Sequence, residues 1–216
     1  MLYVINANGR IVSTRETNAR SGPLLSLIRS NKQCAWAVHA SVPDNIASEI
    51  EALVRQEPPV QDFQGEPLYA QTYISLLKGS VEGGPVFIFP DVLSQSSGVV
   101  TIKDIKPLEK NLRGWAANEI ESCSPILAVV EEGNVVSACF CARRSEVAAE
   151  AGLDTAENWR GRGFAAQVTA AWAQAIRAER LLPVYSTDWD NHASRAVARK
   201  LGLIEVASNW KVVSAA

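Results

Sequence analysis

The stretch 158-NWRGRGFA-165 decides how the rest of this chain is interpreted. Gly161 and Gly163 stand one residue apart between arginines, and they open a long segment with helical periodicity. Glycine allows the backbone to approach an anion closely, and the free N–H groups at a helix start then point toward that anion. The helix dipole adds a further attraction for negative charge. The stretch therefore predicts a phosphate-binding turn at the N-terminus of a helix.

The segment that follows is the strongest helix signal in the sequence and extends to about Arg180. Apolar residues recur there at helical spacing: Phe164, Val168, Ala171, Trp172, Ala175 and Ile176. β-Prone runs at 147–155 and 183–189 flank this helix. Asn191 then caps a second helix that stops at Gly202. One or two final strands are expected within 203–213.

Upstream, residues 126–131 and 135–141 flank Glu132-Gly133-Asn134 and predict an antiparallel hairpin. An earlier hairpin is expected from residues 2–5 and 11–14 around an Asn-Gly turn. The other segments expected to form helices are 23–30, 44–57, 67–78 and 107–120. The other segments expected to form strands are 34–40, 86–90 and 99–103. No internal repeat is evident.

Composition narrows the class of protein. The chain has 216 residues, 47% of them hydrophobic, and a net charge of −2, which gives no reason to expect a nucleic-acid partner. No apolar run reaches the roughly 20 residues that span a bilayer, and the start lacks the features of a signal peptide. We therefore expect a cytoplasmic protein without a membrane partner. The four cysteines do not form zinc-like pairs, so no metal is expected, and Cys139 and Cys141 are expected to be buried.

Two motifs together carry a family resemblance. The first is Asn158-Trp-Arg-Gly-Arg-Gly163, and the second runs from Asn191-His-Ala-Ser194 to Lys200-Leu-Gly-Leu203. With this spacing around a helix and a strand, residues 126–213 resemble the GNAT superfamily of acyl-CoA-dependent N-acetyltransferases, in a branch with a long N-terminal region. Asn158 departs from the family pattern, which has Gln or Arg at this position.

The resemblance implies an α+β fold, a mixed α/β sandwich. Its centre is a twisted, mostly antiparallel sheet with one splayed pair of strands, flanked by helices. We expect residues 86–216 to form the acetyltransferase domain and residues 1–85 to form an N-terminal α/β extension of unknown role. That extension could cover the acceptor cleft or mediate association into a homodimer.

The resemblance also implies acetyl-CoA as cosubstrate, with no metal. The diphosphate would lie on the glycine turn, and pantetheine would lie in the gap beside the strand that ends at Thr155. The residues expected to bind the cosubstrate are Leu153, Asp154, Thr155, Trp159, Arg160, Gly161, Arg162, Gly163, Phe164, Ala165 and Asn191.

The reaction implied is acetyl transfer to a primary amine by direct attack in a ternary complex. It needs a base for the ammonium and an acid for the departing thiolate. Glu150 is the first candidate base and Asp154, on the same strand face, is the second. In many family members a Tyr seven residues after the Asn acts as the general acid, but this chain has Ala198 at that position. Ser194, three residues after the Asn, is the candidate acid.

Alternatives remain at this stage. Gly161-x-Gly163-x-x-Ala166 also fits the loose dinucleotide fingerprint, although the bulky residues before the first glycine and the antiparallel hairpin oppose it. A second alternative is a non-catalytic module that binds acyl-CoA as a sensor. Within the enzymatic reading, the acceptor is a small amine or an amino acid, with an amine on a protein as the alternative.

Overall fold

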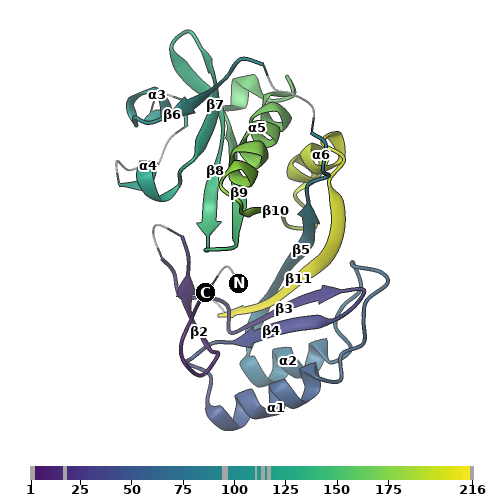
Figure 1. Cartoon of the computed structure of the whole chain (residues 1–216). Coiled ribbons are helices and arrows are strands. Elements are labelled where there is room, and N and C mark those ends of the chain that lie inside the picture. Colours follow the sequence, from purple (N-terminus) through teal and green to yellow (C-terminus); the bar gives the residue numbers. More distant parts are fainter. Residues whose placement is uncertain are drawn as a thin grey trace.

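The computed structural model describes residues 3–16, 19–93, 97–109, 111–112, 115 and 118–214. Two lobes are joined by two long strands (Figure 1). The strands are β1 Tyr3–Ile5, β2 Ile11–Thr14, β3 Leu25–Ser30, β4 Cys34–Val38, β5 Gly79–Ile88, β6 Val99–Ile102, β7 Ile126–Glu131, β8 Asn134–Arg144, β9 Ala148–Thr155, β10 Leu182–Ser186 and β11 Ile204–Ser214. The helices are α1 Asp44–Val54, α2 Ala70–Leu77, α3 Lys106–Glu109, α4 Glu119–Ser122, a 3-10 turn Glu157–Trp159, α5 Phe164–Ala178 and α6 His192–Lys200.

One nine-stranded sheet runs through both lobes in the order β4-β3-β11-β5-β10-β9-β8-β7-β6. Its strand pairs are antiparallel except for β10 and β9, which are parallel. The long strands β5 and β11 pair along most of their lengths and connect the lobes (Figure 1). This mostly antiparallel arrangement confirms the expected fold class and excludes a dinucleotide-binding sheet of alternating strands and helices.

The parallel pair opens partway along its length. The ladder between β9 and β10 ends where Val184 pairs with Glu150, while β9 continues to Thr155 and stays paired with β8. Beyond Glu150, no described strand lies against the β10 side of β9. The sheet therefore splits at a vertex beside Glu150, as the resemblance predicted for one pair of strands.

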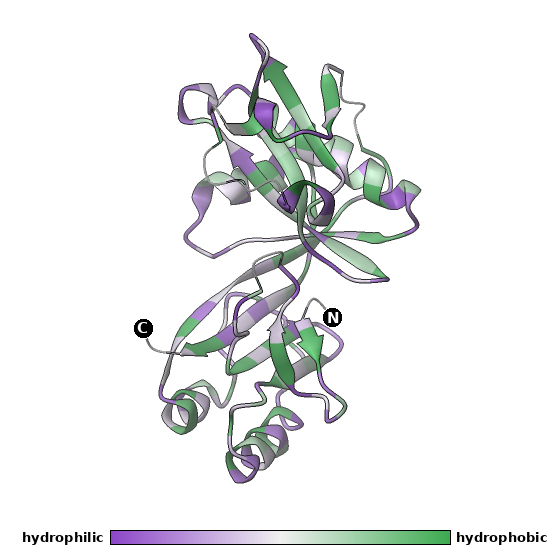
Figure 2. Ribbon diagram, turned by 90° about the vertical axis from the view of Figure 1, so that its left-hand side faces the viewer, coloured by the Kyte–Doolittle hydropathy of each residue, from purple (hydrophilic) through white to green (hydrophobic). Residues whose placement is uncertain are grey.

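Separate hydrophobic cores fix the two lobes. In one, the apolar stripe of α5 packs on the sheet, and Trp172 is fully buried against β-strand residues that include Cys139 and Cys141. In the other, α1 and α2 cover β3, β4 and β11, with Leu25, Leu27 and the ring of Tyr73 at the centre. Green, hydrophobic residues follow the strands of both lobes in Figure 2.

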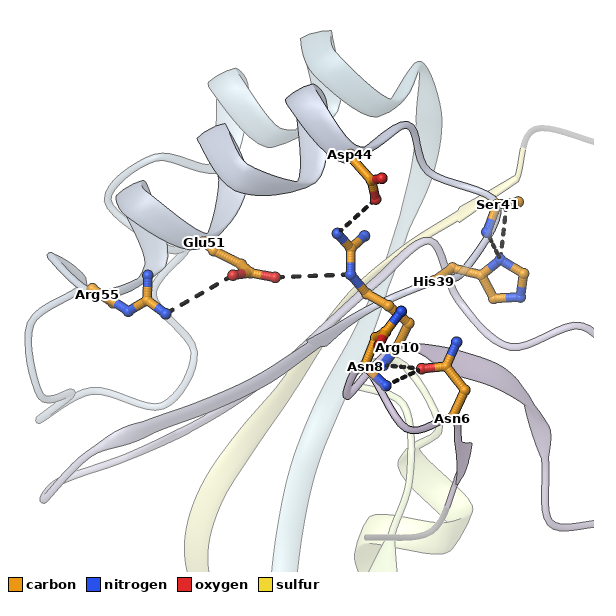
Figure 3. A network of polar contacts seen from close by, with 8 residues as sticks. All are labelled: Asn6, Asn8, Arg10, His39, Ser41, Asp44, Glu51 and Arg55. Carbon is orange, nitrogen blue, oxygen red and sulfur yellow. Dashed lines mark hydrogen bonds and ion pairs between the residues drawn. The ribbon is translucent and has the colours of Figure 1, made fainter.

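The β1–β2 hairpin is held onto the N-terminal lobe by polar contacts, drawn in Figure 3. Within its turn, the Asn6 side chain accepts hydrogen bonds from the backbone N–H groups of Asn8 and Arg10. The Arg10 guanidinium then pairs with Asp44 at 3.4 Å and with Glu51 at 3.9 Å, both on α1. These contacts fix the hairpin against α1 and so place Tyr3 over the sheet.

Most expected elements are present, and two expectations need correction. Residues 23–30 were expected to be helical but form β3, because Leu25 and Leu27 alternate into the α1–α2 core and the run pairs on both edges. The single helix expected over 107–120 is replaced by the short α3 and α4, although five of its positions lie outside the described residues.

The strand expected at 86–90 begins earlier, at Gly79, and residues 79–84 pair with β11. The boundary expected between residues 85 and 86 therefore falls inside β5. Strands from the N-terminal half share the main sheet with the C-terminal half. A functional division of the chain into two domains stays a prediction.

Candidate active site

The split between β9 and β10 opens into a cleft of about 920 Å³. Its walls come from β9, the glycine turn, the start of α5, β10 and α6, with contributions from β5, β8 and β11. Besides Tyr185, the lining includes twelve of the thirteen candidate residues, all but Arg162: Glu150, Leu153, Asp154, Thr155, Trp159, Arg160, Gly161, Gly163, Phe164, Ala165, Asn191 and Ser194. Residues remote in sequence thus meet in one concave site, which is the usual form of a ligand pocket.

The glycine turn forms one end of the cleft. Gly161 and Gly163 have φ angles of 76° and 88°, a left-handed conformation that L side chains rarely adopt. No described carbonyl accepts from the N–H groups of residues 161–163, and the first N–H groups of α5 have no partner within the helix. A Cβ atom built on Gly163 would lie 2.7 Å from the Lys200 ammonium nitrogen. Free N–H groups, a helix N-terminus and a lysine therefore meet at a site suited to a phosphate.

The arginines of this turn point in different directions. The Arg160 side chain donates to the Thr155 carbonyl at 3.3 Å and lines the cleft. The Arg162 guanidinium lies 4.4 Å from the centre of the Trp159 ring and donates to the Asn158 carbonyl. Arg162 is not part of the cleft lining. Trp159 is in the lining, where Phe164 packs beside it with ring centres 6.1 Å apart.

The unpaired edge of β9 follows the turn. Ala156 donates its N–H to Val136 of β8, and the Asp154 carbonyl accepts from Ser137 of β8. Because backbone groups alternate along a strand, those of Leu153 and Thr155 face the gap instead. The backbone N–H and C=O of Leu153 and the N–H of Thr155 thus face the cleft, as an added strand-like ligand requires, while the Thr155 carbonyl accepts from Arg160.

A hydroxyl pair lies across the gap. The Tyr185 and Ser194 hydroxyl oxygens are 2.7 Å apart, and Asn191 caps α6 by accepting the Ser194 N–H at 3.0 Å. Tyr185 is only 2% exposed, and burial raises the pKa of its phenol to about 12. The phenol therefore stays protonated through the physiological range. Ala198 is buried in the α5 core, so this position does not face the cleft.

Glu150 lies at the vertex of the split and is 5% exposed. Its Oε2 atom is 2.6 Å from Nε of Arg143, in a charge pair that lacks the alignment of a hydrogen bond. Its Oε1 atom accepts the hydroxyl of Ser186. Burial alone would lower the pKa of Arg143, but its interactions with Glu150, Tyr3 and Glu16 together outweigh this effect and leave the pKa above its ordinary value. A buried carboxylate is thus held between a cation and a hydroxyl at the inner end of the cleft.

Lys200, Arg143 and Asn209 are among the lining residues that the sequence did not identify. Lys200 belongs to the second motif, and its position as the last residue of α6, beside the glycine turn, was the available signal. Arg143 meets Glu150 only because the β8–β9 register shifts between Cys141 and Arg143. Such a bulge has no reliable sequence signature.

The described residues contain no group of three or more His, Cys, Asp or Glu side chains that could hold a metal ion. His39, buried beneath the hairpin, bonds to Ser41 (Figure 3) and Ser21 outside the cleft. Within the part of the chain that the structure describes, no helix is long and apolar enough to cross a membrane.

Comparison with known proteins agrees with this geometry. Residues 127–212 match the family model described as GNAT acetyltransferase. This segment belongs to the GNAT superfamily. No curated protein sequence matches the chain.

Two solved structures are similar in fold to this chain over more than the segment that matches the family model. A GNAT-family protein from Novosphingobium aromaticivorans aligns with a TM-score of 0.53 at 18% identity, over 63% of this chain and 66% of that one, just under two thirds of its length. A GNAT-family acetyltransferase from Colwellia psychrerythraea aligns with a TM-score of 0.50 at 13% identity, over 96% of this chain and 79% of that one. At these identities the likeness concerns the fold, which in the second case includes the N-terminal half.

Proposed function

We propose that the protein transfers an acetyl group from acetyl-CoA to a primary amine of a small molecule or amino acid, within a ternary complex. The observation that carries the proposal is the order of groups along one cleft. The glycine turn lies at one end, the open edge of β9 follows, and the buried Glu150 carboxylate closes the other end. A phosphate site, a strand-like binding edge and a base are the parts that such a transfer needs.

The residues present fit acetyl-CoA. Gly161 and Gly163 keep the turn free of side chains, and Lys200 adds a positive charge beside it. The N–H groups of the turn and of the α5 start would bind the diphosphate, while Leu153 and Thr155 would bind the pantetheine arm. The cosubstrate supplies an activated acyl group as a thioester. Asn191 lies opposite, where α6 begins.

Glu150 is the proposed base, with Asp154 second because both side chains line the cleft. A carboxylate at this position takes a proton from the ammonium form of the acceptor, which then attacks as a neutral amine. The backbone N–H of Leu153, which faces the gap, donates to the carbonyl oxygen under attack. As the C–N bond forms and the C–S bond breaks, the sulfur needs a proton.

Ser194 is the proposed donor of that proton, and Tyr185 supports it. The 2.7 Å contact lets the tyrosine hydroxyl pass a proton to the serine as the serine gives up its own. In many relatives a tyrosine from α6 has this role, at the position that Ala198 occupies here. The tyrosine of β10 would thus replace it from the neighbouring strand.

Thiol release from acetyl-CoA in the presence of a panel of amines tests the proposal, after a thermal-shift measurement with acetyl-CoA. We expect amine-dependent release that is lost or greatly reduced in Gly161→Glu and Gly163→Glu, because a carboxylate would then occupy the phosphate site. Binding of acetyl-CoA without release for any amine would favour the sensor alternative. Full activity and CoA affinity in both glutamate variants would refute the assignment of the turn.

A further inference from the structure

A second cavity of about 210 Å³ adjoins the acetyl-transfer cleft at Glu150. It is lined mainly by apolar residues, most of them from the N-terminal half, which include Tyr3, Ile28, Ala35, Ala37, Val86 and Val184. Four polar residues line both cavities: Arg143, Glu150, Ser186 and Asn209. The carboxylate proposed as the base thus stands at the boundary between the two spaces.

The fold explains why this space is apolar. Ile28 on β3 pairs with Asn209 on β11, which in turn pairs with Gly84 on β5, so residues from separate strands meet on one face of the sheet. The Tyr3 ring covers part of this face and lies 5.8 Å from the Arg143 guanidinium. The contacts of Arg10 with α1 hold the hairpin that carries Tyr3 (Figure 3).

Two features of the boundary indicate what it binds. The Asn209 side-chain oxygen is buried and accepts no hydrogen bond from a described residue, so it can accept an N–H from a ligand. Arg143 places a fixed positive charge at the same boundary. Because Glu150 neutralises that charge, the apolar walls decide: a second cationic group would lose its hydration among them, whereas an uncharged apolar group would displace water.

Resting on the proposed acetyl transfer, we propose that the acceptor is a primary amine bearing one compact, uncharged apolar group. The group occupies the second cavity, and the amine lies at Glu150 with an N–H donated to Asn209. The cavity holds about seven water volumes at roughly 30 Å³ each, so it suits a branched aliphatic or phenyl group. The N-terminal half thereby selects the acceptor.

A matched pair of amines tests this selection. 3-Methylbutylamine and 1,4-diaminobutane have the same number of non-hydrogen atoms and differ in the end that would enter the cavity. We expect kcat/KM for 3-methylbutylamine to exceed that for 1,4-diaminobutane by about tenfold or more. Calorimetric titration of each amine into the protein with bound coenzyme A should show the same preference without turnover.

Two variants alter the cavity without touching the cleft. Ser26 is buried and lines the second cavity but not the cleft, so Ser26→Leu should fill the second cavity. This variant should raise KM for 3-methylbutylamine about tenfold and leave acetyl-CoA affinity unchanged. Ile28→Ala enlarges the second cavity and should shift the preference toward bulkier amines such as 2-phenylethylamine. Thr101→Leu, on the exposed edge strand β6, is the matched control and should change neither value.

The outcomes separate this inference from the proposed function. Thiol release with equal kcat/KM for both amines, or with diaminobutane preferred, would overturn the inference and leave acetyl transfer standing. Selective binding of 3-methylbutylamine without thiol release would support the cavity assignment and refute acetyl transfer. If Ser26→Leu does not fold, Ile28→Ala, which enlarges the second cavity, tests the inference instead. An unchanged preference among the amines in that variant would overturn the inference.

Discussion

The Arg143 guanidinium Nε and the Glu150 Oε2 atom lie 2.6 Å apart, beside the point where β9 and β10 separate. Neither side chain is more than 17% exposed. A buried carboxylate without a countercharge would tend to be protonated, and a protonated carboxyl is a poor base. Arg143 supplies that countercharge to Glu150, and Ser186 orients the other carboxylate oxygen.

Replacing the candidate base should remove catalysis and spare cosubstrate binding. Glu150→Gln keeps the shape of the side chain but accepts no proton, so kcat/KM for the amine should fall about 10²–10⁴-fold. The acetyl-CoA Kd, measured by calorimetry, should stay within about twofold. Asp154→Asn is the comparison, and a larger loss there than in Glu150→Gln would transfer the role to Asp154.

Removing the arginine should destabilise the protein more than removing both charges. Arg143→Met leaves Glu150 buried without its partner, which should lower the free energy of unfolding by about 3 kcal/mol. Arg143→Met combined with Glu150→Gln should regain much of that loss. Urea unfolding of Arg143→Met, Glu150→Gln and the double variant gives the values, and a double-variant loss equal to the sum of the two single losses would show that the pair is not coupled.

The active-site geometry divides into a part that the sequence could predict and a part that it could not. The glycine turn, Asn191 and Ser194 are local to helix starts, and their spacing carries the information. Arg143 and Asn209 reach the cleft through strand register and order, which depend on contacts remote in sequence. Arg162 was expected beside the phosphates, yet the structure places its guanidinium over Trp159.

Two glycines in the turn should respond differently to the same substitution. Gly161→Ala and Gly163→Ala each force a left-handed alanine, which costs about 1 kcal/mol or slightly more. At Gly163 the new methyl group would also displace the Lys200 ammonium, whereas at Gly161 nothing lies within 4 Å. Thermal melts should show similar destabilisation, but acetyl-CoA affinity should fall more in Gly163→Ala.

Gly202 supplies the control for that comparison. It has a φ angle of 63°, has nothing within 4 Å of a built Cβ and does not line the cleft. Gly202→Ala should therefore lower the melting temperature without changing acetyl-CoA affinity. An affinity loss in Gly202→Ala as large as in Gly163→Ala would mean that strain, and not the position of Lys200, weakens binding.

Lys200 should contribute to binding through its charge. Lys200→Met removes the cation beside the turn. Because the side chain is exposed, we expect the binding free energy of CoA to weaken by only about 1 kcal/mol, which is about a fivefold rise in the CoA Kd. The difference from wild type should shrink at high salt. Arg199→Met removes the neighbouring charge, which does not line the cleft, and should leave the Kd unchanged.

The fold was predictable where amphipathic periodicity was long, as in α5, and uncertain where apolar runs were short. Residues 23–30 illustrate this uncertainty, because the short apolar run PLLSLIRS is compatible with a strand or a helix. Pairing with β4 and β11 makes it a strand. The beginning of β5 at Gly79 was hidden for a related reason. Its glycine-rich first half forms strand only because β11 lies beside it.

Tyr185 offers a pH-dependent test of the hydroxyl pair. Its phenol pKa is about 12 in the folded protein against 10.0 as the ordinary value, because burial disfavours the charged form. The folded state therefore holds this proton more tightly, so the resulting stability is complete below pH 10 and is lost as the pH rises from 10 to 12. Tyr185→Phe should reduce the slope of unfolding free energy against pH in that range, by at most about 1.4 kcal/mol per pH unit.

The same variant has a kinetic consequence that a purely structural role would not produce. Tyr185→Phe leaves Ser194 in place but removes the group that can restore its proton, so kcat should fall while the acetyl-CoA Kd holds. Ser194→Ala should lower kcat at least as much, and the double variant should add little, because residues that act as one unit are not additive. Losses that simply multiply in the double variant would show that the two hydroxyls act independently.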